Sequence, residues 1–203
     1  MKNAVIGIKT LTTLYSVRIL IDAGRLTGLL NIMLSKCQKE LKTMTEIIPN
    51  FFVGTVDDYE GIKENEDFYS VIAAKEPYHR KAVGYSGRSC GKEHPEYLFA
   101  ERERCLICNL VDVENPEWIS PVIISRALDF IENALDKLDR QVLVCCNQGH
   151  SRSAVIGLLY MKHKGFFSGL SFEEAESQYR NIYPDYEPAG GMRGFALQNW
   201  DKI

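Results

Sequence analysis

Residues 142–161 have the sequence VLVCCNQGHSRSAVIGLLYM, and the expected fold is built outward from them. Residues 142–145 form a short apolar run typical of a strand, and residues 152–161 are apolar almost throughout, as in a buried helix. The polar turn between them contains Gly149. A strand, a tight loop and a helix N-terminus bring loop N–H groups and the positive end of the helix to one point. This stretch therefore predicts an anion site.

Two side chains give that site a reactive character. Cys146 stands where the strand ends, and Arg152 follows six residues later, where the helix begins. The loop N–H groups, the helix dipole and the guanidinium all favour the thiolate over the thiol. The same groups suit a phosphate dianion, because the planar fork of arginine can hold two of its oxygens at once. Ser153 is expected to donate a hydrogen bond to the thiolate and to help it leave.

The segment CNQGHSRS, residues 146–153, resembles the Cys-x5-Arg phosphate loop of protein tyrosine phosphatases, and its Ser-Arg-Ser ending is most similar to the dual-specificity branch. The resemblance covers about residues 45–203. It implies an α/β fold with a central, mostly parallel sheet of about four to five strands flanked by helices. It also implies a set of phosphate-binding residues: Asn147, Gln148, Gly149, His150, Ser151 and Arg152. The competing interpretation is a buried structural cysteine beside a surface arginine.

One position departs from the family pattern. The family usually has a histidine immediately before the nucleophile, where it orders the loop, and this chain has Cys145. A thiol is a weaker hydrogen-bonding partner than an imidazole. Two adjacent thiols would be open to oxidation. The favoured interpretation is that Cys145 is a small buried apolar side chain.

A general acid is expected on the loop after the preceding strand. Residues 104–111 read as a strand, Ser120 and Pro121 fit the start of a helix, and apolar positions trace one face from residue 124 to residue 138. This is a βαβ unit, whose two parallel strands end at the same edge of the sheet. Asp112 and Cys146 should therefore face one cleft. The resemblance also places an aspartate acid on this loop; Asp112 is favoured and Glu114 is the alternative.

The other elements follow from local patterns. Residues 47–54 and 69–74 read as strands, and residues 56–63 as a short helix. Ser171 and Glu174 form a capping box that opens a helix over residues 172–182. A final helix is expected to start at Gly194.

Residues 75–103 are expected to be a long polar insert. It leaves the end of a strand at the edge that carries the anion site. Lys75, His79, Arg80 and Arg88 are candidates for phosphate-side contacts, with His79 and Arg80 as the proposed substrate contacts. The plainer alternative for each is a solvated loop charge.

Composition bounds the class of protein. With 203 residues, 45% of them hydrophobic and 25% charged, the chain suits one globular domain with an appendage. Residues 1–44 are expected to be a basic amphipathic extension, and residues 45–203 the catalytic domain. Residues 1–43 hold seven basic and two acidic residues, and these charges argue against a membrane span. The favoured explanation is that natural translation starts at Met44. A targeting leader and contact with a membrane surface are weaker alternatives.

The six cysteines are read as free thiols in a reducing, cytoplasmic compartment, because a thiolate enzyme needs a reduced nucleophile. Cys105 and Cys108 form a C-x-x-C motif. On a strand, however, side chains three positions apart face opposite sides. No second motif completes a zinc site, so no metal is expected.

The sequence thus predicts a cysteine-dependent phosphomonoesterase that forms a cysteinyl-phosphate intermediate and needs no cofactor. Its expected partner is a phosphorylated protein, with phosphotyrosine as the first substrate and phosphoserine or phosphothreonine as further ones. RNA 5′-triphosphate and small phosphate esters are alternative substrates, although no specific nucleic-acid partner is indicated. The loop itself carries no lysine before Arg152, which disfavours polyphosphoinositides. Two other functions stay open: a phosphate-binding protein that has lost catalysis and, less favoured, a sulfurtransferase.

Overall fold

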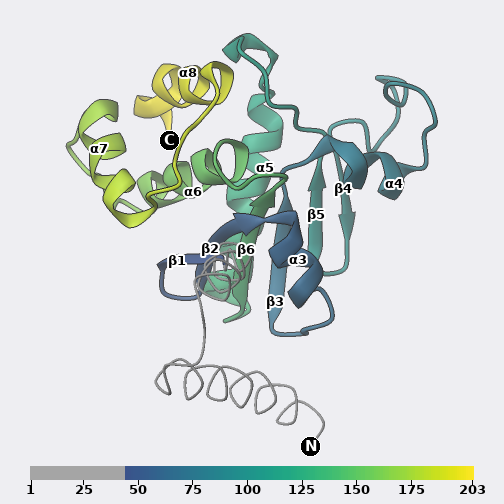
Figure 1. Ribbon diagram of the computed structural model, residues 1–203, viewed down its shortest axis with the longest axis horizontal. Helices are drawn as coiled ribbons and strands as arrows, with labels where there is room; N and C mark the ends of the chain where they lie inside the picture. Colours follow the sequence, from purple (N-terminus) through teal and green to yellow (C-terminus); the bar gives the residue numbers. More distant parts are fainter. Residues whose placement is uncertain (1–43) are drawn as a thin grey trace, which may run out of the picture. The chain divides into compact units, whose positions relative to one another are not determined.

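The computed structural model describes residues 44–203 (Figure 1). The predicted basic extension, residues 1–43, lies outside the described residues, and the domain boundary at residue 45 stays a prediction. A six-stranded sheet forms the centre, in the order β1-β2-β6-β3-β5-β4. The strands are β1 (Thr45–Ile48), β2 (Phe51–Thr55), β3 (Phe68–Ile72), β4 (Phe99–Arg102), β5 (Cys105–Cys108) and β6 (Gln141–Cys146). The four inner strands are parallel, and both edge strands are antiparallel to their neighbours.

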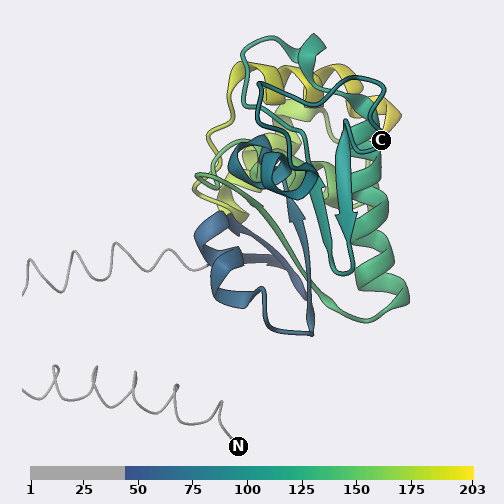
Figure 2. The same cartoon turned by 90° about the vertical axis from the view of Figure 1, so that its right-hand side faces the viewer.

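Helices cover both faces of this sheet (Figure 2). On one face lie α3 (Val56–Ile62) and α4 (Arg80–Val83), and on the other lie α5 (Pro121–Glu132) and α6 (Arg152–His163). Two further helices, α7 (Phe172–Ile182) and α8 (Gly190–Asn199), belong to the core of the second face. The short helices are η1 (Lys75–His79), η2 (Pro116–Trp118), η3 (Asn133–Lys137) and η4 (Trp200–Lys202).

The expected α/β class with a mostly parallel sheet is confirmed, but the sheet has six strands rather than four or five. The two additional strands are its edges. Residues 47–54 were expected to be one strand, yet a turn at Asn50, whose φ is 64°, folds them into the β1-β2 hairpin. Strand β4 lies inside the predicted polar insert. Only Ala100 of its four residues is fully buried, so its sequence lacks a strong strand pattern.

The observed starts of α7 and α8 can be compared with the predicted ones. The capping box of α7 is confirmed, since the Ser171 side chain accepts from the Glu174 N–H and the Glu174 side chain accepts in return. Helix α8 begins at Gly190, four residues before the predicted start. Its first turn packs closely on another backbone: a Cβ added at Gly191 would lie 2.2 Å from the Val113 carbonyl oxygen. A contact between segments so distant in sequence leaves no local signal.

Strand β6 separates two adjacent thiols. Cys145 lies in the apolar cluster under α3 and α4, whereas Cys146 belongs to the cluster around α6. Burial raises the pKa of the Cys145 thiol well above its ordinary value. Its interpretation as a small buried apolar side chain agrees with this position. Cys105 and Cys108 likewise pack in opposite clusters, as expected for side chains three positions apart on a strand.

Helix α6 is buried along its first ten residues. Its one glycine, Gly157, lies so close to the sheet and to α7 that a Cβ would be 2.6 Å from Tyr179 Oη and 2.8 Å from a Val53 methyl. Within residues 44–203, no helix is long and apolar enough to cross a membrane.

We predict that Gly157→Ala lowers the free energy of unfolding by about 1–3 kcal/mol, because the core must move to admit a methyl group. Gly61→Ala is the matched control, since a Cβ at that helical position meets nothing within 4 Å. Replacing glycine by alanine there should leave stability equal or higher. Urea unfolding measures both variants, and an unchanged Gly157→Ala midpoint would contradict the close packing of α6.

Candidate active site

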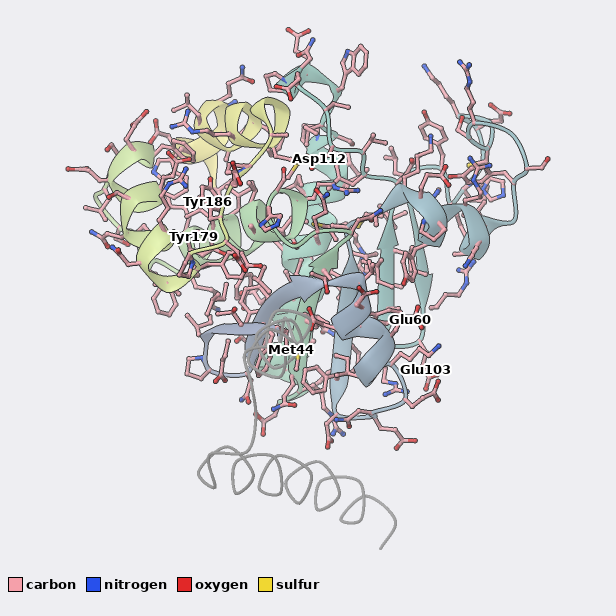
Figure 3. All side chains as sticks on the ribbon, viewed as in Figure 1. Met44, Glu60, Glu103, Asp112, Tyr179 and Tyr186 are labelled. Carbon is pink, nitrogen blue, oxygen red and sulfur yellow. The ribbon has the colours of Figure 1, made fainter. Side chains whose placement is uncertain are left out.

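The carboxyl ends of the four parallel strands meet at one edge of the sheet. Thr55 ends β2 and Cys146 ends β6; Lys75 follows β3, and Asp112 follows β5. Figure 3 labels Asp112 at this edge. The expectation that Asp112 and Cys146 belong to one cleft therefore agrees with the topology.

The Cys146 thiol lies beneath the phosphate loop, defined here as residues 146–152, and is 1% exposed. Ser153 Oγ lies 3.2 Å from Cys146 Sγ and can donate to it. The same hydroxyl is 3.2 Å from the carbonyl oxygens of Gly54 and Gly149. Its single proton can go to only one acceptor at a time. A negative charge on the sulfur would attract that proton, so Ser153 is placed to stabilise a thiolate.

The Arg152 side chain is held at the edge of the same loop and is 11% exposed. Its Nη1 donates to the Leu110 carbonyl oxygen at 3.1 Å. Its Nε is buried and has no hydrogen-bond partner within residues 44–203; the Asp112 Oδ2 atom is 3.9 Å away. Buried guanidinium N–H groups are normally paired. The Nε–H group can therefore donate a hydrogen bond to an oxygen of a bound anion.

Asp112 is tied to the phosphate loop through Ser151. Ser151 Oγ donates to Asp112 Oδ1 at 2.7 Å and accepts from the Ala189 N–H at 3.0 Å. Glu114, the alternative acid, lies elsewhere: a Cβ added at Gly190, in the first turn of α8, would be 2.5 Å from Glu114 Oε2. Of the two candidate acids, Asp112 is the one beside the loop.

The remaining loop residues have distinct positions. Gly149 has a φ of 81°, which glycine adopts without strain, and a Cβ there would meet the Tyr183 hydroxyl at 3.1 Å. That hydroxyl donates to the Gly149 carbonyl oxygen at 3.0 Å. His150 Nδ1 is 2.9 Å from the Asp185 carbonyl oxygen, and Gln148 is exposed. Tyr183 lies 34 positions from Gly149, so the sequence carries no local signal of its support of the loop.

A cavity of about 470 Å³ opens beside the loop. Its lining comes from three segments: the phosphate loop with Asn147 and Arg152, the end of β5 with Leu110, Val111 and Asp112, and the insert with Lys75, Glu76, Arg80 and Arg88. Asn147 Nδ2 joins two of these segments, because it donates to the Glu76 carbonyl oxygen at 3.2 Å. The insert thus forms one wall of the cavity.

The prediction that His79 contacts substrate is wrong. The side chain is fully buried under the insert; its Nε2 is 2.8 Å from the Glu96 carbonyl oxygen and its Nδ1 is 3.2 Å from the Tyr85 hydroxyl. It does not line the cavity. Burial lowers its pKa below the usual value. A histidine after Pro77 and Tyr78 suggested chemistry, but its role here is to hold the insert together.

Arg80 does line the cavity, yet its charge is paired. Its Nη2 and Nε atoms each lie 2.7 Å from an oxygen of Glu76. This pair places Arg80 in the wall of the site rather than leaving it available as a free cation. Among residues 44–203, no group of three or more His, Cys, Asp and Glu side chains is arranged to hold a metal ion.

Comparisons with known proteins support the fold. No family model matches the chain, and no curated protein matches its sequence. Three solved structures that match it are a leucine-rich repeat and phosphatase domain containing protein from Entamoeba histolytica, a human tyrosine phosphatase-like serine/threonine/tyrosine-interacting protein, and the PTP-2 phosphatase of Cydia pomonella. Their TM-scores are 0.55, 0.53 and 0.55, at 16%, 19% and 14% identity. The matches cover 79%, 80% and 78% of this chain and 91%, 97% and 91% of theirs. The chain therefore has the fold of tyrosine and dual-specificity phosphatases, as the phosphate loop predicted.

We predict that acidification destabilises the protein through His79. Because its folded pKa is lowered, the unfolded chain binds the proton more tightly, so stability is lost as the pH falls below about 6.5. Urea unfolding of the wild type and of His79→Gln from about pH 7.5 to about pH 5 isolates this contribution. The stability advantage of the wild type should shrink towards acid pH. An advantage that grows instead would mean that His79 is protonated in the folded state.

Proposed function

We propose that this protein is a cysteine-dependent phosphomonoesterase. The observation that carries the proposal is the guanidinium of Arg152: its buried Nε has no hydrogen-bond partner among residues 44–203 and lies at the loop that holds Cys146. A buried donor of this kind is satisfied by an oxygen of a bound phosphate. The thiol beneath the loop and the Ser153 hydroxyl at 3.2 Å supply a nucleophile and its stabilising donor.

The first step transfers the phosphoryl group to sulfur. The Cys146 thiolate attacks phosphorus in line, so that an S–P bond forms while the P–O bond to the leaving group breaks. Arg152 and the loop N–H groups stabilise the three equatorial oxygens as charge shifts in the transition state. Asp112 enters this step protonated and gives its proton to the departing oxygen.

The second step releases phosphate. The Asp112 carboxylate accepts a proton from water, the water oxygen attacks phosphorus, and the S–P bond breaks to give inorganic phosphate and the Cys146 thiolate. Ser153 donates to the departing sulfur. Asp112 gives one proton to the leaving group and takes another from water, so it ends the cycle protonated, as it began, and the proposed chemistry uses only side chains of this chain and water.

The substrates proposed are phosphorylated protein side chains, phosphotyrosine first and phosphoserine or phosphothreonine second. This choice rests on the resemblance of the phosphate loop to the dual-specificity branch and on the shared fold. The phosphate loop contributes one cationic side chain, Arg152, to the cavity.

A second candidate function is phosphate binding without turnover. It is favoured by Cys145, which stands where the family pattern has a histidine and whose side chain lies in the cluster on the opposite face of the sheet. The loop therefore lacks a hydrogen bond that orders it in the family. A protein of this kind would bind a phosphopeptide and release no phosphate.

We predict that Cys146→Ser abolishes release of phosphate from a phosphotyrosine peptide, because a serine hydroxyl is a far poorer nucleophile than a thiolate. Cys90→Ser is the matched control, since this half-buried thiol of the insert lies outside the cavity lining. A malachite-green assay measures released phosphate. Turnover by Cys146→Ser equal to that of Cys90→Ser would rule out the proposed nucleophile. Binding of the peptide with no turnover by any variant would favour the second candidate function.

We also predict that Asp112→Asn lowers kcat by about 10²–10³-fold with phenyl phosphate, because a phenolate leaves poorly without a proton. The loss should be smaller with 4-nitrophenyl phosphate, whose leaving group is more acidic. Glu114→Gln, next to α8, should retain kcat within about twofold. The assignment of the acid reverses if Glu114→Gln shows the larger, leaving-group-dependent loss.

A further inference from the structure

The cavity beside the phosphate loop carries more positive charge than one phosphate group requires. Four of its lining side chains are cationic and two are anionic: Lys75, Arg80, Arg88 and Arg152 against Glu76 and Asp112. The proposed reaction assigns Arg152 to the transferred phosphoryl group and Asp112 to proton transfer. Three cations and one carboxylate then remain, all of them on the insert.

Two of those cations have no side-chain partner among the residues that the structure describes. Arg80 and Glu76 satisfy each other through two contacts of 2.7 Å. In contrast, the side chains of Lys75 and Arg88 make no hydrogen bond and no ion pair within residues 44–203, although both line the cavity. Unpaired cations usually extend into solvent, but these two lie beside an anion site.

The backbone beneath both cations is braced. Arg80 Nη1 donates to the carbonyl oxygens of Tyr85, Ser86 and Gly87, the three residues just before Arg88. The other side of the same guanidinium pairs with Glu76, which follows Lys75. One side chain therefore fixes the segments that carry both unpaired cations. Ordering the Arg80 side chain costs conformational entropy, so its contacts must stabilise the insert by more than this cost.

These segments are also joined to the reaction centre. The Lys75 N–H donates to the Leu110 carbonyl oxygen at 3.1 Å, and the same oxygen accepts from Arg152 Nη1. The Asn147 side chain connects the phosphate loop to the Glu76 carbonyl oxygen. The backbone segments that carry Lys75 and Arg88 are thus joined to the site where Arg152 is proposed to bind phosphate.

The local charge is opposite to that of the surrounding chain. Residues 44–203 contain 17 basic and 25 acidic residues, a net charge of −8. A positive cavity in a negative domain concentrates anions at one place, and such focusing attracts multiply charged ligands most strongly. The cations come from the insert, so the absence of lysine in the phosphate loop does not limit the cavity to one anionic group.

We propose, resting on the function proposed above, that the substrate is a phosphate monoester with a second anionic group, phosphate or carboxylate, close to the reacting phosphate. Lys75 and Arg88 bind this second group, and Arg80 positions them. The insert thereby selects the substrate, while the phosphate loop performs the reaction.

A matched series of aryl phosphates tests the proposal on the full chain. Phenyl phosphate carries one anionic group, 3-carboxyphenyl phosphate adds a carboxylate, 1,3-phenylene bisphosphate adds a phosphate, and 3-carbamoylphenyl phosphate adds a neutral group of similar size. The wild type should prefer the bisphosphate to phenyl phosphate by about tenfold in kcat/KM, with the amide no better than phenyl phosphate. Raising the salt from about 20 mM to about 300 mM should reduce the preference. The second anionic group is a carboxylate if 3-carboxyphenyl phosphate has the higher kcat/KM, and a phosphate if 1,3-phenylene bisphosphate has.

The variants assign the preference to its residues. In Lys75→Gln/Arg88→Gln the ratio of the two kcat/KM values should fall to about twofold. The double variant Lys81→Gln/Lys92→Gln removes the same charge from exposed positions of the insert outside the cavity lining and should keep the wild-type ratio. Equal ratios in the two double variants, or equal kcat/KM for both substrates in the wild type, would overturn the proposal.

A binding measurement separates this proposal from the proposed function. Titration calorimetry of Cys146→Ser with the bisphosphate and with phenyl phosphate reports the preference without turnover. If no variant hydrolyses any substrate, yet binding prefers the bisphosphate and loses that preference without Lys75 and Arg88, the reaction is wrong and the second anion site stands. If hydrolysis occurs with no preference in either measurement, the reaction stands and the second site is refuted.

Discussion

The Leu110 carbonyl oxygen accepts two hydrogen bonds, one from Arg152 Nη1 and one from the Lys75 N–H, and the candidate site depends on this shared acceptor. Leu110 follows β5, Lys75 follows β3, and Arg152 opens the helix that follows β6. One oxygen therefore sets the relative positions of three neighbouring segments at the sheet edge. Because both donors approach the same atom, a shift of any one segment would disturb the other two.

The alternation of side chains along β6 separates the Cys146 thiol from its neighbour. Cys145 and Cys146 are adjacent in sequence, but the strand directs them into separate clusters. If both thiols lay on the same face of the strand, both would lie beside the phosphate loop and could be oxidised together. In this arrangement Cys145 contributes apolar packing, and only Cys146 shares the surroundings of Ser153.

The elements that could be predicted from the sequence are those whose pattern lies within one short stretch of residues. The strand, the loop glycine and the buried helix lie within residues 142–161, so their pattern could be read directly, as could the capping box at Ser171. The βαβ connection was enough to bring Asp112 to the loop. What could not be predicted depends on contacts between distant segments. The Tyr183 hydroxyl donates to the Gly149 carbonyl oxygen, 34 positions away. The buried His79 ring contacts the Glu96 carbonyl oxygen, 17 positions away. Nothing near His79 distinguishes a histidine inside an insert from one that faces a substrate.

The buried carboxylate of Glu176 has a consequence for how this protein tolerates change. It receives two hydrogen bonds from Arg193, at 2.8 and 2.7 Å, and one from the Tyr186 hydroxyl, at 3.1 Å. Figure 3 labels Tyr186 beside Tyr179 of α7, and their rings pack edge to face. The chain from Tyr183 to Ala189, which this carboxylate anchors, reaches back to Gly149, His150 and Ser151. Substitutions at Glu176 or Arg193 therefore reach the phosphate loop through this segment, although none of the last thirty side chains lines the cavity.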